Sequence, residues 1–146
     1  MTAVTGFNDR SMINQCLLYR YVISYEPYNF KGRLDDYPLT MAYGEQMDAL
    51  RAELRDYFWD GEFRDTVGAQ VTNAGKPHHP YAVFINAKTG ASGLVICNYD
   101  ETKPITVTAS LDSGEKLNRC RLVDDPTWRP AAGEITIPPL SAVVVI

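Results

Sequence analysis

The stretch that decides the fold is "GEITIPPLSAVVVI", residues 133–146. A short alternating run is followed by two prolines and then by five residues without a polar side chain, residues 142–146. A free terminus normally frays and is polar, so the rest of the protein must hold this segment. At an exposed sheet edge it would promote aggregation. We therefore expect it to be a strand in the middle of a sheet, with both faces covered.

Length and composition limit the classes of protein to consider. The chain of 146 residues is 45% apolar and 22% charged, which is ordinary for one globular domain, with or without a small extension. Its net charge of −4, without a basic cluster, argues against nucleic acid as a partner. The sequence shows neither a signal peptide nor an apolar run near the ~20 residues of a membrane span. We expect a cytoplasmic protein without a membrane partner.

Neither the cysteines nor the histidines form a metal-binding motif. Cys16, Cys97 and Cys120 are odd in number and lack CxxC spacing, which is typical of buried free thiols; a Cys97–Cys120 disulfide is the alternative. His78 and His79 are the only histidines, whereas zinc takes three or four ligands. We expect no metal and no cofactor.

Two pairs of aspartates, at residues 35–36 and 124–125, precede prolines or turns. Carboxylates in such places cap helices and brace loops. A calcium site is the alternative, but the sequence contains no EF-hand spacing. We therefore interpret both pairs as structural.

The first part of the chain has helical periodicity. Residues 40–61 carry apolar side chains at steps of four, three, four and three, which form one stripe along a helix. The stripe consists of Tyr43, Met47, Leu50, Leu54 and Tyr57. A shorter helix is predicted over residues 9–21, with Met12, Ile13, Cys16 and Leu17 on its apolar side.

After Arg64 the period changes to two. The strand candidates are "VGAQVT", "YAVFINA", "GLVICNYD", "PITVTASL", "LNRCRLVD", "GEITIP" and "SAVVVI", and we expect "DDPTWRPAAG" to be a loop. Short strands separated by frequent turn signals predict an antiparallel sandwich. The predicted fold class is α+β: a helical segment at residues 1–62 packed on a β-sandwich of six to seven short strands at residues 63–146.

Three stretches carry a resemblance to a known family. They are residues 93–111, "GLVICNYDETKPITVTASL", the closing pattern G-x-I-x-I-P-P-x-S-A-V-V-V, and residues 13–63. Together they resemble the C-terminal part of barrel-type glycoside hydrolases related to α-amylases and α-galactosidases. In those enzymes the last units of a (β/α)8 barrel are followed by a small β-sandwich.

The resemblance implies a non-catalytic C-terminal portion of a glycoside hydrolase, whose sandwich braces the barrel. Such a barrel takes about 250 residues, and the family's pair of catalytic carboxyl groups lies upstream of this stretch, so no catalytic residue is expected here. If residues 22–25 are the last barrel strand, Glu26, Tyr28 and Asn29 follow it at the active-site face. They would then contact sugar; alternatively, they only fix the loop.

Two other functions stay open. A stand-alone structural or oligomerisation domain would self-associate through the helical segment, whereas a missing upstream barrel would leave an apolar face on the stripe of residues 43–57. A carbohydrate-binding module would need aligned exposed aromatic side chains, but the wet face of residues 105–111 is Thr and Ser. Trp128, in the predicted loop, is expected either to contact sugar or to anchor that loop.

Overall fold

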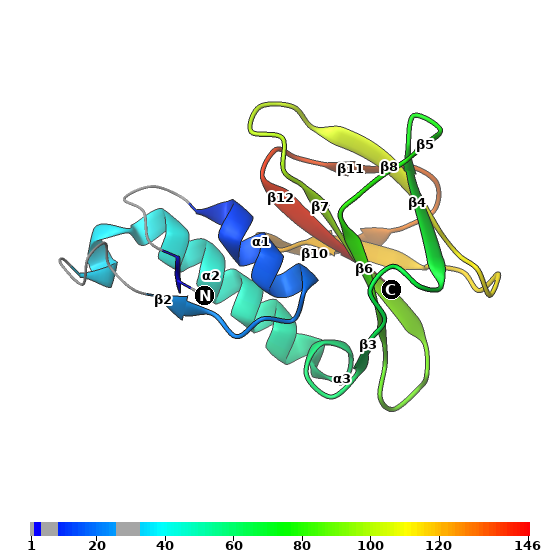
Figure 1. Ribbon diagram of the computed structural model, residues 1–146, viewed down its shortest axis with the longest axis horizontal. Coiled ribbons are helices and arrows are strands. Elements are labelled where there is room, and N and C mark those ends of the chain that lie inside the picture. The colour runs from blue at the N-terminus through cyan, green and yellow to red at the C-terminus, as the bar shows by residue number, and fades with distance from the viewer. Residues whose placement is uncertain (1, 4–8, 26–32) are drawn as a thin grey trace.

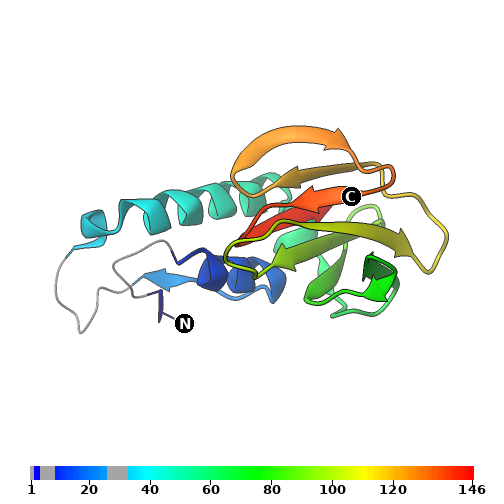
Figure 2. The same cartoon turned by 90° about the horizontal axis from the view of Figure 1, so that it is seen from above.

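The computed structural model describes residues 2–3, 9–25 and 33–146. Three layers follow one another: helices, a six-stranded sheet and a four-stranded sheet. Figure 1 shows the helices gathered on one side of the strands, and Figure 2 shows the same arrangement from above. Both large sheets are antiparallel, so the predicted α+β fold with a helical segment on a β-sandwich is confirmed.

The helical layer has two main helices. Helix α1 is Arg10–Leu18, and the side chain of Asp9 caps it by accepting a hydrogen bond from the backbone N–H of Met12 at 3.2 Å. A short 3-10 helix, Leu34–Asp36, precedes α2, Pro38–Glu53, and α3, Arg55–Phe58, follows directly. Pro38 stands in the first turn of α2, where a missing N–H costs nothing.

The predicted apolar stripe is buried within this chain. Tyr43, Met47 and Leu50 are at most 3% exposed, and the stripe continues across the break between α2 and α3. The stripe packs with α1 and with one face of the six-stranded sheet. The expectation that residues 43–57 would present an uncovered apolar face is therefore wrong, because α1 and the sheet already cover it.

A separate pair of short strands precedes α2. Strand β1, Thr2–Ala3, lies parallel to β2, Ser24–Tyr25, and α1 connects them. The register pairs Thr2 with Ser24 and Ala3 with Tyr25. The chain thus begins with a β–α–β unit and continues into a second helix.

The six-stranded sheet lies between the helices and the other sheet. In spatial order its strands are β10 (Asp125–Pro130), β9 (Arg119–Leu122), β12 (Ser141–Val145), β7 (Ser92–Asn98), β6 (Tyr81–Ile85) and β3 (Glu62–Phe63). Every neighbouring pair is antiparallel.

The four-stranded sheet closes the sandwich. Its order is β11 (Ile135–Ile137), β8 (Ile105–Leu111), β4 (Ala69–Asn73) and β5 (Lys76–Pro77). Strand β8 alternates as predicted, with Val107 buried and Thr106 and Thr108 exposed. The outer face of this sheet carries hydroxyl groups paired across strands, such as Thr72 with Thr108 at 2.8 Å.

The apolar strand within residues 133–146 lies where it was predicted, in the middle of a sheet. Strand β12 pairs with β7 on one side and with β9 on the other. Ala142 and Val144 face the helices, and Val143 and Val145 face the four-stranded sheet, all at most 1% exposed. Both faces of this strand are covered, which explains the absence of polar side chains.

The prediction of six to seven strands was too low, because the described part of the two sheets has ten. Strands β3, β5 and β10 were missed. Strand β10 was predicted as a loop because it contains Pro126 and Pro130, which cannot donate to a ladder. It lies at the sheet edge, where prolines are tolerated, and its pairing with β9 is irregular between Asp125 and Arg129.

Candidate functional site

The residues predicted to contact sugar, Glu26, Tyr28 and Asn29, lie outside the described residues. The strand predicted just before them, at residues 22–25, is found in its last two residues as β2. A sugar contact by these three side chains therefore stays a prediction. The described part of the chain offers a different site.

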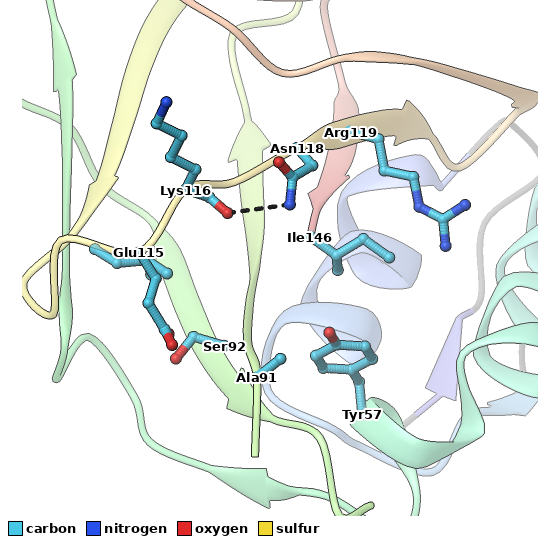
Figure 3. Close-up of a pocket in the computed structure, with 9 residues that line it drawn as sticks. Tyr57, Ala91, Ser92, Glu115, Lys116, Asn118, Arg119 and Ile146 are labelled. Carbon is cyan, nitrogen blue, oxygen red and sulfur yellow. Dashed lines mark hydrogen bonds between the residues drawn. The ribbon is translucent and has the colours of Figure 1, made fainter. Parts of the chain in front are cut away.

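An open depression of about 430 Å³ lies at one end of the sandwich (Figure 3). Its walls come from α3, the start of β7, the end of β8, the β8–β9 connection, the start of β9 and the residue after β12. The lining residues are Tyr57, Ala91, Ser92, Leu111, Glu115, Lys116, Asn118, Arg119 and Ile146. Such a volume lies within the range of small-molecule pockets, about 300–1,000 Å³.

The apolar part of the depression packs against Gly93 of β7. A Cβ atom on Gly93 would lie 2.9 Å from Cγ2 of Ile146 and 3.0 Å from Cε1 of Tyr57. The bare backbone of β7 therefore lets both side chains lie close to it. Tyr57 is only 8% exposed, and burial raises the pKa of its phenol, which keeps the hydroxyl group protonated at neutral pH.

Arg119 supplies a positive charge to the lining of the depression. Its Cζ atom lies 4.4 Å from the ring centroid of Trp128, a cation–π contact. The side chain is exposed, and among the described residues no carboxylate forms an ion pair with it. In Figure 3, Tyr57 and Ile146 lie between Arg119 on one side and Glu115 with Ser92 on the other.

Backbone hydrogen bonds fix the position of Arg119. The N–H groups of Asn118 and Arg119 both donate to the carbonyl oxygen of Ile146, at 2.8 and 2.9 Å, and the N–H of Ile146 donates back to Arg119 at 2.9 Å. The side-chain amide of Asn118 donates to the carbonyl of Lys116 at 3.3 Å. The start of β9 is thus tied to the end of β12.

Trp128 anchors the edge strand β10 to the helical layer. Its indole N–H donates to Oε1 of Glu53 at 3.1 Å, and Glu53 also forms an ion pair with the buried Arg121. The ring is partly buried and packs against the core shared by helices and sheet. Of the two roles considered for Trp128, the structure shows anchoring, although the anchored segment is a strand rather than a loop.

A second polar cluster lies between the helices and the sheet. The hydroxyl group of Tyr43 donates to Oδ1 of Asn14 at 2.6 Å, and the amide of Asn14 donates to the carbonyl of Leu140 at 3.1 Å. Arg10 lies over the ring of Tyr43 at 4.0 Å and forms an ion pair with Asp124. Burial raises the pKa of Tyr43 well above its usual range, so this group stays a donor. The cluster joins both helices to the loop before β12.

The two histidines have separate structural partners. A ring nitrogen of His78 lies 3.0 Å from the carbonyl oxygen of Cys97, and the ring of His79 stacks on Tyr81 with centroids 5.4 Å apart. Within residues 2–3, 9–25 and 33–146, no group of three or more His, Cys, Asp or Glu side chains is placed to hold a metal ion.

The aspartate pairs brace loops, as predicted. Asp36 accepts the backbone N–H of Arg33 at 2.8 Å, and Asp35 forms an ion pair with the side chain of Arg33. Asp125 accepts the backbone N–H of Thr127 at 3.0 Å, which lowers the pKa of its carboxyl group.

All three cysteines are buried and none is in a disulfide, as predicted. Cys97 faces the helices, whereas Cys120 faces the four-stranded sheet. The alternative of a Cys97–Cys120 disulfide is therefore wrong, because the two side chains belong to opposite faces of the sheet.

No protein-family model, curated protein or solved structure matches this chain. A membrane-spanning helix is also not found: none in the described part of the chain has the length and apolar character required. The depression and its surroundings must therefore be interpreted from their own chemistry.

Sequence reasoning missed the depression. Its residues are drawn from positions 57 to 146 and share no motif. The available signal was indirect: an arginine and an asparagine at the start of a predicted strand, and a tryptophan ten residues later. Only the sheet order brings Arg119, Trp128 and Ile146 together.

Proposed function

We propose that this chain is the non-catalytic C-terminal portion of a barrel-type glycoside hydrolase, in which the β-sandwich braces the barrel. The sequence resemblance and the order of the structural elements both support the proposal. No catalytic residue is assigned to the chain itself. Carbohydrate is the substrate class of the parent enzyme, and the cytoplasm, where free thiols persist, is its proposed location.

The observation that carries the proposal is the β1–α1–β2–α2 order. Strands β1 and β2 are parallel and joined by a helix, and a second helix follows, which is the repeating unit of a (β/α)8 barrel. Parallel sheets are found almost always within larger layered sheets, and a pair of two-residue strands is too small to be stable alone. Further parallel strands beside β1 and β2 would complete such a sheet.

Exposed apolar side chains close to β2 also support the proposal. Tyr19, Tyr21 and Val22 are 38%, 45% and 75% exposed and lie between α1 and β2. Contiguous apolar surface of this kind often marks a contact with another part of a protein. An upstream barrel unit is the occupant that the proposal assigns to it.

The bracing role rests on how α2 and α3 join the sandwich. Leu50, Leu54 and Phe58 belong to the same buried core as the strands of the six-stranded sheet. The ion pair of Glu53 with Arg121 adds a polar contact between the end of α2 and β9. A barrel ending in α2 would therefore be held rigidly against the sandwich.

The test is the identity of the native polypeptide. An antibody raised against this chain is used to isolate the protein from cells of its source, and its tryptic peptides are sequenced by mass spectrometry. We expect a polypeptide several times larger than 16.3 kDa, with peptides upstream of Met1 and hydrolytic activity on aryl glycosides. A native polypeptide of 16.3 kDa would contradict the proposal.

The isolated chain provides a second test of the non-catalytic assignment. We expect it to hydrolyse no aryl glycoside, because the family's carboxyl pair lies upstream. Activity in the isolated chain that disappears in Glu26→Gln would show that the assignment is wrong.

A further inference from the structure

We propose that the open depression beside Arg119 binds a sugar acid, with the ligand carboxylate held by Arg119 and its hydroxyl groups directed toward Glu115, Ser92 and Asn118. The proposal does not depend on the barrel: the depression is formed entirely by the sandwich and α3. A failure of either proposal therefore leaves the other standing.

The guanidinium group of Arg119 is the reason for proposing a carboxylate on the ligand. One face of its guanidinium group lies on Trp128 at 4.4 Å, and a stacked guanidinium keeps its in-plane N–H groups available. Such a fork matches a carboxylate with two parallel hydrogen bonds. Because the backbone of Arg119 is tied to Ile146, the group is positioned before any ligand arrives.

The polar residues on the side of the depression opposite Arg119 are the reason for proposing hydroxyl groups on the ligand. Glu115 and Ser92 line that side, and Asn118 also lines the depression (Figure 3). A carboxylate accepts hydrogen bonds, an amide donates and accepts, and a serine hydroxyl does both. All three groups accept hydrogen bonds, and Asn118 and Ser92 also donate them, so a hydroxyl group, which donates and accepts, can pair with each of the three.

The size and apolar floor suit a sugar ring. Tyr57, Ile146, Leu111 and Ala91 supply carbon surface between the two polar sides, and the volume of about 430 Å³ admits a monosaccharide. In Figure 3 the ammonium end of Lys116 points away from Arg119. The depression therefore concentrates its positive charge at one point, which fits a ligand with a single carboxylate.

The test is an NMR titration of the ¹⁵N-labelled chain with glucuronate. Glucose, which lacks the carboxylate, and acetate, which lacks the hydroxyl groups, are titrated in parallel. We expect glucuronate to cause saturable shifts of the amide signals of Ser92, Asn118 and Arg119, with an affinity on the order of millimolar. Glucose and acetate should each bind at least tenfold more weakly.

Two variants test whether Arg119 binds the carboxylate of glucuronate. Arg119→Gln should weaken glucuronate binding by tenfold or more, and Arg119→Lys, which keeps the charge but loses the planar fork, should fall between. Arg129→Gln is the matched control, because it removes an exposed arginine from the neighbouring strand, outside the depression. The spectrum of each variant without ligand shows whether it is folded.

Several outcomes would overturn the proposal. They are equal shifts with glucose and glucuronate, shifts confined to other surfaces, and no shifts at tens of millimolar glucuronate. Equal weakening in Arg119→Gln and Arg129→Gln would show general attraction of an anion rather than a site. If Arg119→Gln does not fold, Ser92→Ala is the second variant, and unchanged binding in it would remove the hydroxyl part of the proposal.

Discussion

At the scale of single residues, Gly93 shapes the candidate site through the side chain that it lacks. The close approach of Tyr57 and Ile146 to β7 leaves no room for a methyl group. The position is extended strand backbone, so the glycine is needed for space rather than for a left-handed conformation. Gly93 therefore determines how closely Tyr57 and Ile146, two residues of the floor, pack against β7.

Gly93→Ala tests this packing. The added methyl group must displace Ile146 or Tyr57, and overpacking of this kind costs about 1–3 kcal/mol of unfolding free energy. Urea denaturation measures the loss. Ser92→Ala, the adjacent substitution, adds no atom and should stay within about 0.5 kcal/mol. Wild-type stability in Gly93→Ala would mean that the two side chains move away freely.

The carboxyl group of Asp100 makes the stability of the protein depend on pH. It accepts the backbone N–H groups of Thr102 and Lys103 at 2.9 and 2.8 Å, and these hydrogen bonds lower the pKa of its carboxyl group. A lowered folded-state pKa stabilises the protein above the unfolded value, near 3.9, and this contribution is lost as the pH falls through the folded-state pKa.

We therefore expect Asp100→Asn to be less stable than wild type at pH 7, with the difference disappearing as the pH falls through the lowered folded-state pKa of Asp100. Thermal unfolding followed by circular dichroism across this pH range makes the comparison. A constant difference between the two proteins at every pH would contradict the role of the charge.

At the scale of elements, the periodicity of apolar residues predicted the helices and strands that have one buried face. The stripe from Tyr43 to Tyr57 predicted a helix, and the alternation in β8 predicted a half-buried strand; both were confirmed. Strand β10 was missed because its two prolines are typical of a loop, and the break at Leu54 was missed because it leaves the apolar stripe unchanged. The depression could not be predicted either, since its residues meet only through sheet order.

Substitution of Glu53 tests the contact between the end of α2 and the edge of the six-stranded sheet. Glu53→Ala leaves the guanidinium group of Arg121 buried without its carboxylate and the indole N–H of Trp128 without its acceptor. The expected cost is about 1–3 kcal/mol of unfolding free energy, measured by urea denaturation. Glu53→Gln keeps an acceptor for Trp128 and should lie between.

Glu45→Ala is the matched control for that substitution. Glu45 is an exposed glutamate on the same helix, so its replacement should change the unfolding free energy by no more than about 0.5 kcal/mol. Equal effects at both positions would mean that loss of a glutamate from this helix, rather than loss of the contact with Arg121, is responsible.

At the scale of the whole molecule, β12 joins the three layers. Its residues alternate between the core that it shares with the helices and the core between the two sheets. The boundary predicted at residue 62 separates helical from β sequence, but side chains from both parts belong to one buried core. Helices and strands should therefore unfold together.

Removal of residues 140–146 should abolish cooperative unfolding. Ala142 to Val145 are four fully buried residues, and the three valines alone contribute about 1.5–3 kcal/mol each, a total comparable with the lower part of the 5–15 kcal/mol reserve of a typical domain. A truncated chain that melts cooperatively at the wild-type temperature would contradict the central role of β12.

Val144→Ala is the milder form of this test. It should cost roughly 1–3 kcal/mol and shift the far-ultraviolet and near-ultraviolet melting curves by the same amount. Curves that separate would show that the helical layer unfolds independently of the sandwich.

The outer strands of the two large sheets have a consequence for polymerisation. Strands β3 and β5 have two residues each and β11 has three, while β10 and β5 contain proline. Short, proline-bearing edges offer almost no template for main-chain hydrogen bonds from a second molecule. Concentrated solutions should therefore resist growth of cross-β fibrils from the native state, and recognition of these sheets must operate through side chains.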